Sequence, residues 1–259
     1  MRLIQPFSPD LPPGVGSAFP ECGPMAFACV DLAEISDFLQ AGKDSGVEAE
    51  FLSTGEQRQF ARFSLEKRRS EWLGGRIAAK WAAATLLGVA PPYWRQFTIA
   101  AEASGRPFLQ TDHPAPGLFI SISHSGPLAA AMAAKISCGL DIQRIVPKIL
   151  ALHSRFANER EEELLQGKAP ALSREELLSL LWAAKEAVRK MLPISPLAGL
   201  LELQLVAAKN GPGKGEEPLL LALRLKRKNT ALTREIPVLA WLVDDLAWAI
   251  TALPNSSGE

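Results

Sequence analysis

The chain has 259 residues, and 47% of them are hydrophobic, so it can bury one large core or two modest ones. Its 28 lysines and arginines balance its 28 aspartates and glutamates. This balance excludes the global basic field of a nucleic-acid coat protein, and any basic site must be local. The apolar runs are far shorter than the ~20 residues that cross a bilayer. Neither nucleic acid nor a membrane is therefore an expected partner.

The N-terminal residues and the cysteines bear on the compartment. The first nine residues contain no long apolar stretch of the kind found in secretory signals. Cys22, Cys29 and Cys138 are odd in number and fit no zinc spacing, so buried free thiols are expected. Both features favour a cytoplasmic protein.

The first half of the chain changes its period twice. Prolines throughout residues 1–24 predict an irregular lead-in, and the apolar stretch 26–32 suits a first strand. Residues 54–88 carry apolar residues at helical spacing and end on the stop signal Gly88. After that, short apolar runs between turn signals predict strands at 97–100, 107–109, 118–122 and 128–136, and a further strand at 140–145 begins the second half.

The second half repeats this order. Residues 156–192 are predicted to be helical and to end before Pro193. The stretches 200–207, 219–225 and 238–251 predict strands of an antiparallel meander.

These elements predict an α+β protein of two similar halves related by a pseudo-twofold, each an antiparallel sheet packed against helices. The N-terminal half would be 1–136, with the Pro-rich lead-in, a basic helix and a Ser/His-rich strand. The C-terminal half would be 137–259. A site is expected in the seam between the halves, where pockets often occur.

Asp141 and Gln143 form the first candidate site. At strand period they share one face, while Leu140 and Ile142 lie on the other. Two adjacent oxygen donors can bind a hard cation directly or through water. An exposed strand face is the competing interpretation, and the pair alone would favour it.

A narrow polar stripe on the second helix is the next candidate. Trp182, Glu186 and Lys190 recur at every fourth residue, and Lys185 and Arg189 form the neighbouring row. The flanking residues are mostly leucine and alanine, so the stripe is predicted to be partly buried and to require partners. Mg²⁺ and phosphate would supply them. The alternative is a solvated face with one Glu–Lys pair within the helix.

Residues 120–126, Ile-Ser-Ile-Ser-His-Ser-Gly, place hydroxyls and an imidazole at the end of a strand. Ser123 and His124 could donate to an anion; a polar strand edge is the alternative. A hydrolase that uses these two residues is a further functional hypothesis. The sequence disfavours it because the Gly-x-Ser-x-Gly elbow is missing and neighbouring strand residues point to opposite faces.

Three basic residues of the first half also stand out. Arg76 and Lys80 are embedded among alanine, isoleucine and tryptophan, and Arg106 is held at a turn between Gly105 and Pro107. Ordinary solvated surface is the competing interpretation for such residues.

In this order the motifs resemble the 4′-phosphopantetheinyl transferase superfamily, in its long (Sfp-like) branch of two similar halves. Residues 182–190, Trp-Ala-Ala-Lys-Glu-Ala-Val-Arg-Lys, are similar to the family pattern W-x-x-K-E-x-x-x-K. Residues 139–143, Gly-Leu-Asp-Ile-Gln, are similar to G-[IV]-D-[IV]-E. Supporting matches lie at 69–80, 105–107 and 122–125.

The resemblance implies an enzyme of the holo-acyl-carrier-protein synthase type. Such enzymes transfer the phosphopantetheine arm of coenzyme A to a serine of an apo acyl or peptidyl carrier protein and release 3′,5′-ADP. The expected donor is coenzyme A and the expected cofactor is Mg²⁺. A monomer is expected, because one chain contains both halves.

The resemblance also implies a role for each matching residue. Asp141 and Glu186 would bind Mg²⁺, and Glu186 would also act, directly or through water, as the base for the carrier serine. Lys185 and Lys190 would hold the pyrophosphate or steady the leaving group. The coenzyme A phosphates and nucleotide end would be held by Ser123, His124, Arg76, Lys80 and Arg106.

Gln143 departs from the family pattern, which has an acid at this position. A neutral amide is a poorer Mg²⁺ ligand but can orient a bound water, so Gln143 is expected to act through water at most. This departure supports the competing hypothesis of a catalytically decayed relative that only binds carrier domains or coenzyme A. The retention of Asp141, Glu186 and Lys190 argues against that hypothesis.

Overall fold

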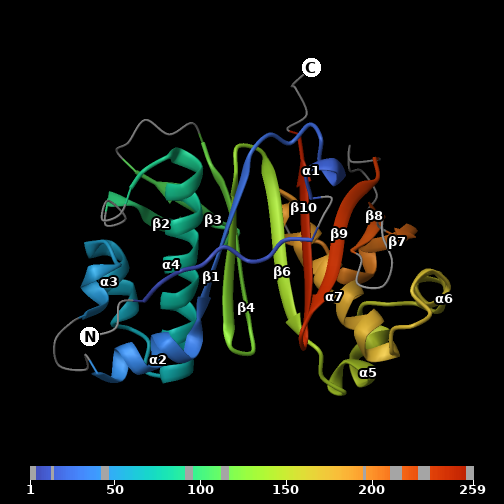
Figure 1. The fold of residues 1–259 in the computed structure, drawn as a ribbon, viewed down its shortest axis with the longest axis horizontal. Helices are drawn as coiled ribbons and strands as arrows, with labels where there is room; N and C mark the ends of the chain where they lie inside the picture. The colour runs from blue at the N-terminus through green and yellow to red at the C-terminus, as the bar shows by residue number, and fades with distance from the viewer. Residues whose placement is uncertain are drawn as a thin grey trace. The chain divides into compact units, whose positions relative to one another are not determined.

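The computed structural model describes residues 4–12, 15–41, 47–90, 96–111, 117–194, 197–210, 218–226 and 234–254. The chain divides into two compact units (Figure 1). Unit 1 comprises Met1–Asp10 and Gly23–Lys135, and unit 2 comprises Leu11–Cys22 and Ile136–Glu259. The lead-in is thus divided: Leu11–Cys22 belongs to unit 2, although the sequence predicted that all of 1–24 would belong to the first half.

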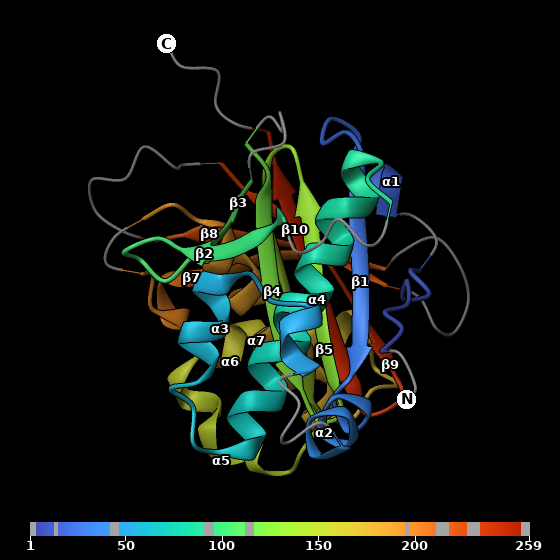
Figure 2. The ribbon, with the colours of Figure 1, turned by 90° about the vertical axis from the view of Figure 1, so that its left-hand side faces the viewer.

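Unit 1 is built on a five-stranded antiparallel sheet of order β1-β5-β4-β3-β2. Helix α4 lies across β1, β4 and β5 (Figure 2). The strands are β1 (Met25–Asp31), β2 (Thr98–Ala101), β3 (Pro107–Gln110), β4 (Phe119–Ser125) and β5 (Leu128–Ala134). The helices are α2 (Leu32–Ala41), η1 (Val47–Glu50), α3 (Thr54–Phe60) and α4 (Glu66–Leu87).

The long helix of unit 1 ends where the sequence predicted. Gly88 adopts φ 67°, a left-handed conformation that glycine tolerates without a steric penalty. The amides of Gly88 and Val89 then donate to the carbonyls of Thr85 and Ala84 and close the last turn. The buried residues of α4, such as Leu73 and Ile77, face the sheet and form the core of unit 1.

Unit 2 repeats this plan. Its five-stranded antiparallel sheet has the order β6-β10-β9-β8-β7, with α7 packed on β6, β9 and β10. The strands are β6 (Ser137–Arg144), β7 (Leu203–Asn210), β8 (Leu219–Leu225), β9 (Ile236–Val243) and β10 (Leu246–Leu253). The helices are α1 (Val15–Ala18), α5 (Lys148–Leu152), η3 (His153–Arg155), α6 (Glu159–Lys168), α7 (Arg174–Met191) and η4 (Leu200–Glu202). The predicted α+β class with two similar halves is confirmed.

Two local features of the fold differ from the expectations drawn from the sequence. The apolar run 238–251 is not continuous, because a turn at Asp244 and Asp245 separates β9 from β10. Asp244 has φ 52°, a left-handed conformation that aspartate adopts more readily than most residues. Helix α2 was not predicted at all, although its buried Ile35, Phe38 and Leu39 recur at helical spacing.

The three cysteines are free and buried, as the sequence predicted. Among the described helices, none is both long and apolar enough to cross a membrane.

Candidate active site on β6 and α7

A glycine sets how closely α7 approaches β6. Gly139, Asp141 and Gln143 alternate along β6 on one face. A Cβ atom on Gly139 would overlap the carbonyl oxygen of Ala187 and lie 3.1 Å from Cβ of Met191, both on α7. Only glycine therefore lets the helix backbone lie directly against this part of the strand, and Asp141 is the next residue on the same face.

Asp141 forms an ion pair with Lys190 across this contact. Its Oδ1 lies 2.6 Å from Nζ of Lys190, which also donates to the carbonyl of Leu140 at 3.2 Å. Asp141 is only 6% exposed, so its carboxylate is largely removed from water. The structure thus brings together two of the three residues that the sequence predicted to be catalytic.

Glu186 is the third of the residues predicted to be catalytic. It lies one helical turn before Lys190 on the same stripe, and its Oε1 accepts a hydrogen bond from Arg189 at 2.9 Å. Its side chain is partly exposed, at 17%, so a ligand can reach it. The stripe is neither fully buried nor a solvated face, which agrees with the narrow polar row predicted from the sequence.

Gln143 lies further along β6 and is more exposed than Asp141. Its amide nitrogen donates to the carbonyl of Arg144 at 2.9 Å. This contact turns one end of the amide to the backbone and leaves the oxygen as the group suited to accept from water.

Lys185 does not occupy the predicted place. Its side chain is fully buried, and Nζ lies 2.7 Å from Oε1 of Glu161 and 2.5 Å from the carbonyl oxygen of Phe156. Burial lowers the pKa of Lys185 below its ordinary value, while the ion pair with Glu161 opposes that shift. Because no part of the ammonium is accessible, a pyrophosphate cannot reach it, and the predicted contact is corrected to a structural one.

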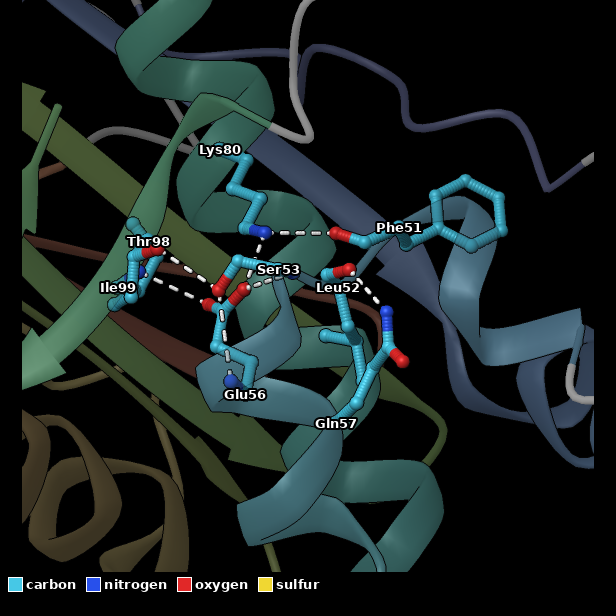
Figure 3. Close-up of polar contacts among 8 residues, drawn as sticks. All are labelled: Phe51, Leu52, Ser53, Glu56, Gln57, Lys80, Thr98 and Ile99. Carbon is cyan, nitrogen blue, oxygen red and sulfur yellow. Dashed lines mark hydrogen bonds and ion pairs between the residues drawn. The ribbon is translucent and has the colours of Figure 1, made fainter. Parts of the chain in front are cut away.

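Lys80 of unit 1 requires the same correction. It is fully buried on α4, with Nζ 2.5 Å from Oε2 of Glu56 and 2.7 Å from the carbonyl oxygen of Phe51 (Figure 3). Burial lowers the pKa of Lys80, and Glu56 again opposes the shift. A coenzyme A phosphate could not contact this ammonium. Both lysines follow two alanines, which already indicated burial, but their glutamate partners were not recognised.

Arg76 remains accessible one turn before Lys80. Its guanidinium carbon lies 3.9 Å from the ring centroid of Trp72, and burial lowers its pKa to about 10. Among the described residues, its Nε has no hydrogen-bond partner. Arg106 similarly lies over the ring of Phe119, at 4.9 Å. Aromatic surfaces thus support the remaining predicted cations of unit 1.

The predicted Ser/His segment forms β4. Ser123 is buried, whereas His124 is exposed and places Nδ1 3.6 Å from Oε1 of Glu71 on α4. Glu71 was not among the predicted site residues. Because Ser123 and His124 are neighbours on one strand, their side chains leave opposite faces, which weakens the hydrolase hypothesis.

Comparison with known proteins decides the family. The model of the 4′-phosphopantetheinyl transferase superfamily matches residues 137–234, and that of the 4′-phosphopantetheinyl transferase N-terminal domain matches residues 56–134. A holo-[acyl-carrier-protein] synthase of Shouchella clausii (strain KSM-K16) is 32% identical over 106 residues, which are 39% of this chain and 90% of that protein. The chain belongs to the 4′-phosphopantetheinyl transferase superfamily.

This confirms the predicted resemblance, and the match to an N-terminal domain indicates the longer form. The chain is therefore a transferase of this superfamily. Solved structures similar to it include the holo-ACP synthase of Plasmodium yoelii (18% identity, 44% of this chain and 93% of that chain, TM-score 0.38). The Helicobacter pylori holo-[acyl-carrier-protein] synthase in complex with coenzyme A is another (20%, 43% and 98%, TM-score 0.37).

Proposed function

We propose that the chain transfers the 4′-phosphopantetheine arm of coenzyme A to a serine of an apo carrier protein, in a Mg²⁺-dependent reaction that releases 3′,5′-ADP. The single observation that carries the proposal is the Asp141–Lys190 pair across β6 and α7, with Glu186 one turn away. Family membership supplies the reaction class, and these residues supply the chemistry.

The side chains fit a magnesium ion. Within the described residues, no group of three or more histidines, cysteines and acids is clustered, so an ion here would have few protein ligands. Mg²⁺ tolerates this well, since it keeps several waters and commonly takes one or two carboxylates plus substrate phosphates. Asp141 and Glu186 would hold it, and Gln143 would orient one of its waters. Bound there, Mg²⁺ would neutralise charge on the diphosphate oxygens.

Lys190 and Arg189 supply the other charges of the site. The ammonium of Lys190 lies against the Asp141 carboxylate, from where its long side chain can reach a diphosphate oxygen. Arg189 holds the Glu186 carboxylate by its hydrogen bond. Cations placed where phosphoryl charge develops lower the barrier, because they cost no reorganisation during the reaction.

In the proposed reaction, the carrier serine Oγ attacks the phosphorus that bears the pantetheine arm. A new P–O bond forms while the bond from that phosphorus to the bridging oxygen breaks, and the electron pair leaves on 3′,5′-ADP. The serine proton passes to Glu186, directly or through water, because an unassisted hydroxyl is a poor nucleophile.

Unit 1 would bind the nucleotide end of coenzyme A. Arg76, Arg106, Ser123 and His124 are the predicted residues that keep this role, and Lys80 is excluded by its burial.

Intact-mass measurement of several apo carriers tests the proposal. Acyl carriers of fatty-acid and polyketide synthesis and a peptidyl carrier would each be incubated with the protein, coenzyme A and Mg²⁺. We expect at least one carrier to gain a single phosphopantetheine, with no gain after addition of EDTA or after the carrier serine is changed to alanine. Carriers that bind the protein but never gain mass would contradict the transfer and support the binding-only hypothesis.

A further inference from the structure

The two units contain the same buried cluster at the same spacing along the chain. In each, a lysine of the long helix lies against the glutamate of a preceding capping box and the carbonyl of a phenylalanine. The unit 1 cluster is Phe51, Ser53, Glu56 and Lys80, and the unit 2 cluster is Phe156, Asn158, Glu161 and Lys185. In both units the lysine follows the phenylalanine by 29 residues.

Figure 3 shows how the cluster connects three elements of unit 1. Glu56 accepts from Lys80 on α4, from the Ser53 amide at the start of α3 at 2.9 Å, and from the Ile99 amide on β2 at 2.9 Å. One carboxylate thus receives hydrogen bonds from a helix, a helix start and a strand.

Unit 2 repeats these contacts with different neighbours. Glu161 accepts from Lys185 on α7, from the Asn158 amide at the start of α6 at 3.1 Å, and from the Leu205 amide on β7 at 2.7 Å. Lys185 also donates to the carbonyl of Phe156, which packs edge-on against Trp182 of α7. The cluster therefore joins α7 to α6 and β7.

The repetition stops at the residues of the candidate site. One and five residues after Lys185 stand Glu186 and Lys190, whereas one and five residues after Lys80 stand Trp81 and Thr85. The buried pair is thus present in a helix that lacks the acid and the base. Its presence there points to placement of the helix rather than to ligand binding.

We propose that Lys185 is a positioning residue for the transfer reaction, an inference that rests on the proposed function. Lys185 and Lys190 lie about 140° apart around the helix axis, since each residue turns an α-helix by about 100°. The ion pair of Lys185 with Glu161 therefore holds α7 on one side and directs Lys190 toward Asp141 on the other. Without this ion pair α7 can rotate or slide, and Glu186, the next residue after Lys185, moves with the helix.

A double-mutant cycle separates this role from direct contact with the substrate. Lys185→Met leaves the Glu161 carboxylate buried without its cation, so we expect a lower melting temperature. We also expect kcat to fall ~10–100-fold, the range for supporting residues of a site, with the KM for coenzyme A little changed. Lys185→Met combined with Glu161→Gln replaces the ion pair by neutral groups of similar size, and the side-chain oxygen of the new glutamine can still accept from the amide of Asn158 or of Leu205. This neutral pair should keep α7 packed in place, so we expect recovery of the melting temperature and of most of kcat.

Two outcomes of the cycle would overturn the inference. A double variant that regains its melting temperature but not its kcat would show that turnover needs the Lys185 ammonium itself and not the placement of α7. A normal kcat in Lys185→Met would show that the ion pair with Glu161 does not position the site. Lys80→Met is the matched control: it should lose comparable thermal stability with a smaller loss of kcat. An equal loss of kcat would show that turnover follows stability alone, which also contradicts the inference.

Hydrogen exchange without substrates keeps this test independent of the proposed function. In Lys185→Met, we expect faster exchange of the α7 amides around Glu186 than in the unchanged protein, and recovery in the double variant. Unchanged exchange in Lys185→Met would contradict the positioning role even if the protein transfers phosphopantetheine. A protein that transfers nothing but shows the expected exchange would instead contradict the proposed function.

Discussion

The two units share a scaffold and differ in the residues that can do chemistry. Both have a five-stranded sheet of the same strand order, and both fix their long helix by a buried lysine on a capping-box glutamate. Only α7 continues with an acid and a base, Glu186 and Lys190, and Lys190 forms an ion pair with Asp141 on β6. The buried pair is thus part of the repeated architecture, and the reactive groups are additions to one copy.

The units also differ in how helix and sheet come close. In unit 2 the glycine is on the strand, Gly139, whereas in unit 1 the helix itself carries Gly74 and Gly75. A Cβ on Gly75 would lie 2.9 Å from a methyl carbon of Ile122, a side-chain atom that can move. The obstacle at Gly139 is helix backbone, which cannot. Of these two glycine contacts, the tighter one is therefore at Gly139, two residues from Asp141 on β6.

The largest effect is expected from the acid that has no counterpart in unit 1. Glu186→Gln should reduce the rate of transfer at least ~100-fold, because it removes a metal ligand and a proton acceptor together. Intact-mass kinetics on an apo carrier measures this. Glu163→Gln, an exposed glutamate of α6, is the control and should transfer normally. Near-normal transfer by Glu186→Gln would remove the chemical distinction between the two helices.

The next effect compares the two glycine contacts. Gly139→Ala should lower the free energy of unfolding by about 3 kcal/mol, the upper end for overpacking, because the Ala187 carbonyl must move. Gly75→Ala should change it by about 1 kcal/mol or less, since the better helix propensity of alanine offsets displacement of Ile122. Chemical denaturation of both variants measures the difference. Equal costs would show that the two helices approach their sheets alike.

The smallest effect concerns the caps that hold the buried glutamates. Ser53→Ala and Asn158→Ala should each lower the free energy of unfolding by about 1 kcal/mol, because each side chain accepts from the amide of its glutamate. Similar losses of stability would support the equivalence of the two buried clusters. If Asn158→Ala alone destabilises the protein, the clusters are not equivalent.

Sequence patterns predicted what depends on local spacing. The stop at Gly88, the alternation of Asp141 and Gln143 and the stripe of Glu186 and Lys190 all follow from residues within one element. The partners of Lys80 and Lys185 could not be predicted in this way, because each glutamate belongs to a separate helix. Ser53 with Glu56 and Asn158 with Glu161 have the spacing of capping boxes, but no local pattern shows that their carboxylates also receive a buried ammonium.

Metal binding tests the central claim most directly, namely that carboxylates from β6 and α7 share one cation. Mn²⁺, which favours the same oxygen ligands as Mg²⁺, can be titrated by electron paramagnetic resonance in the presence of coenzyme A. We expect one ion per chain, and we expect Asp141→Asn and Glu186→Gln each to weaken binding by more than ~10-fold while the proteins stay folded. Unchanged Mn²⁺ affinity in either folded variant would contradict the shared site.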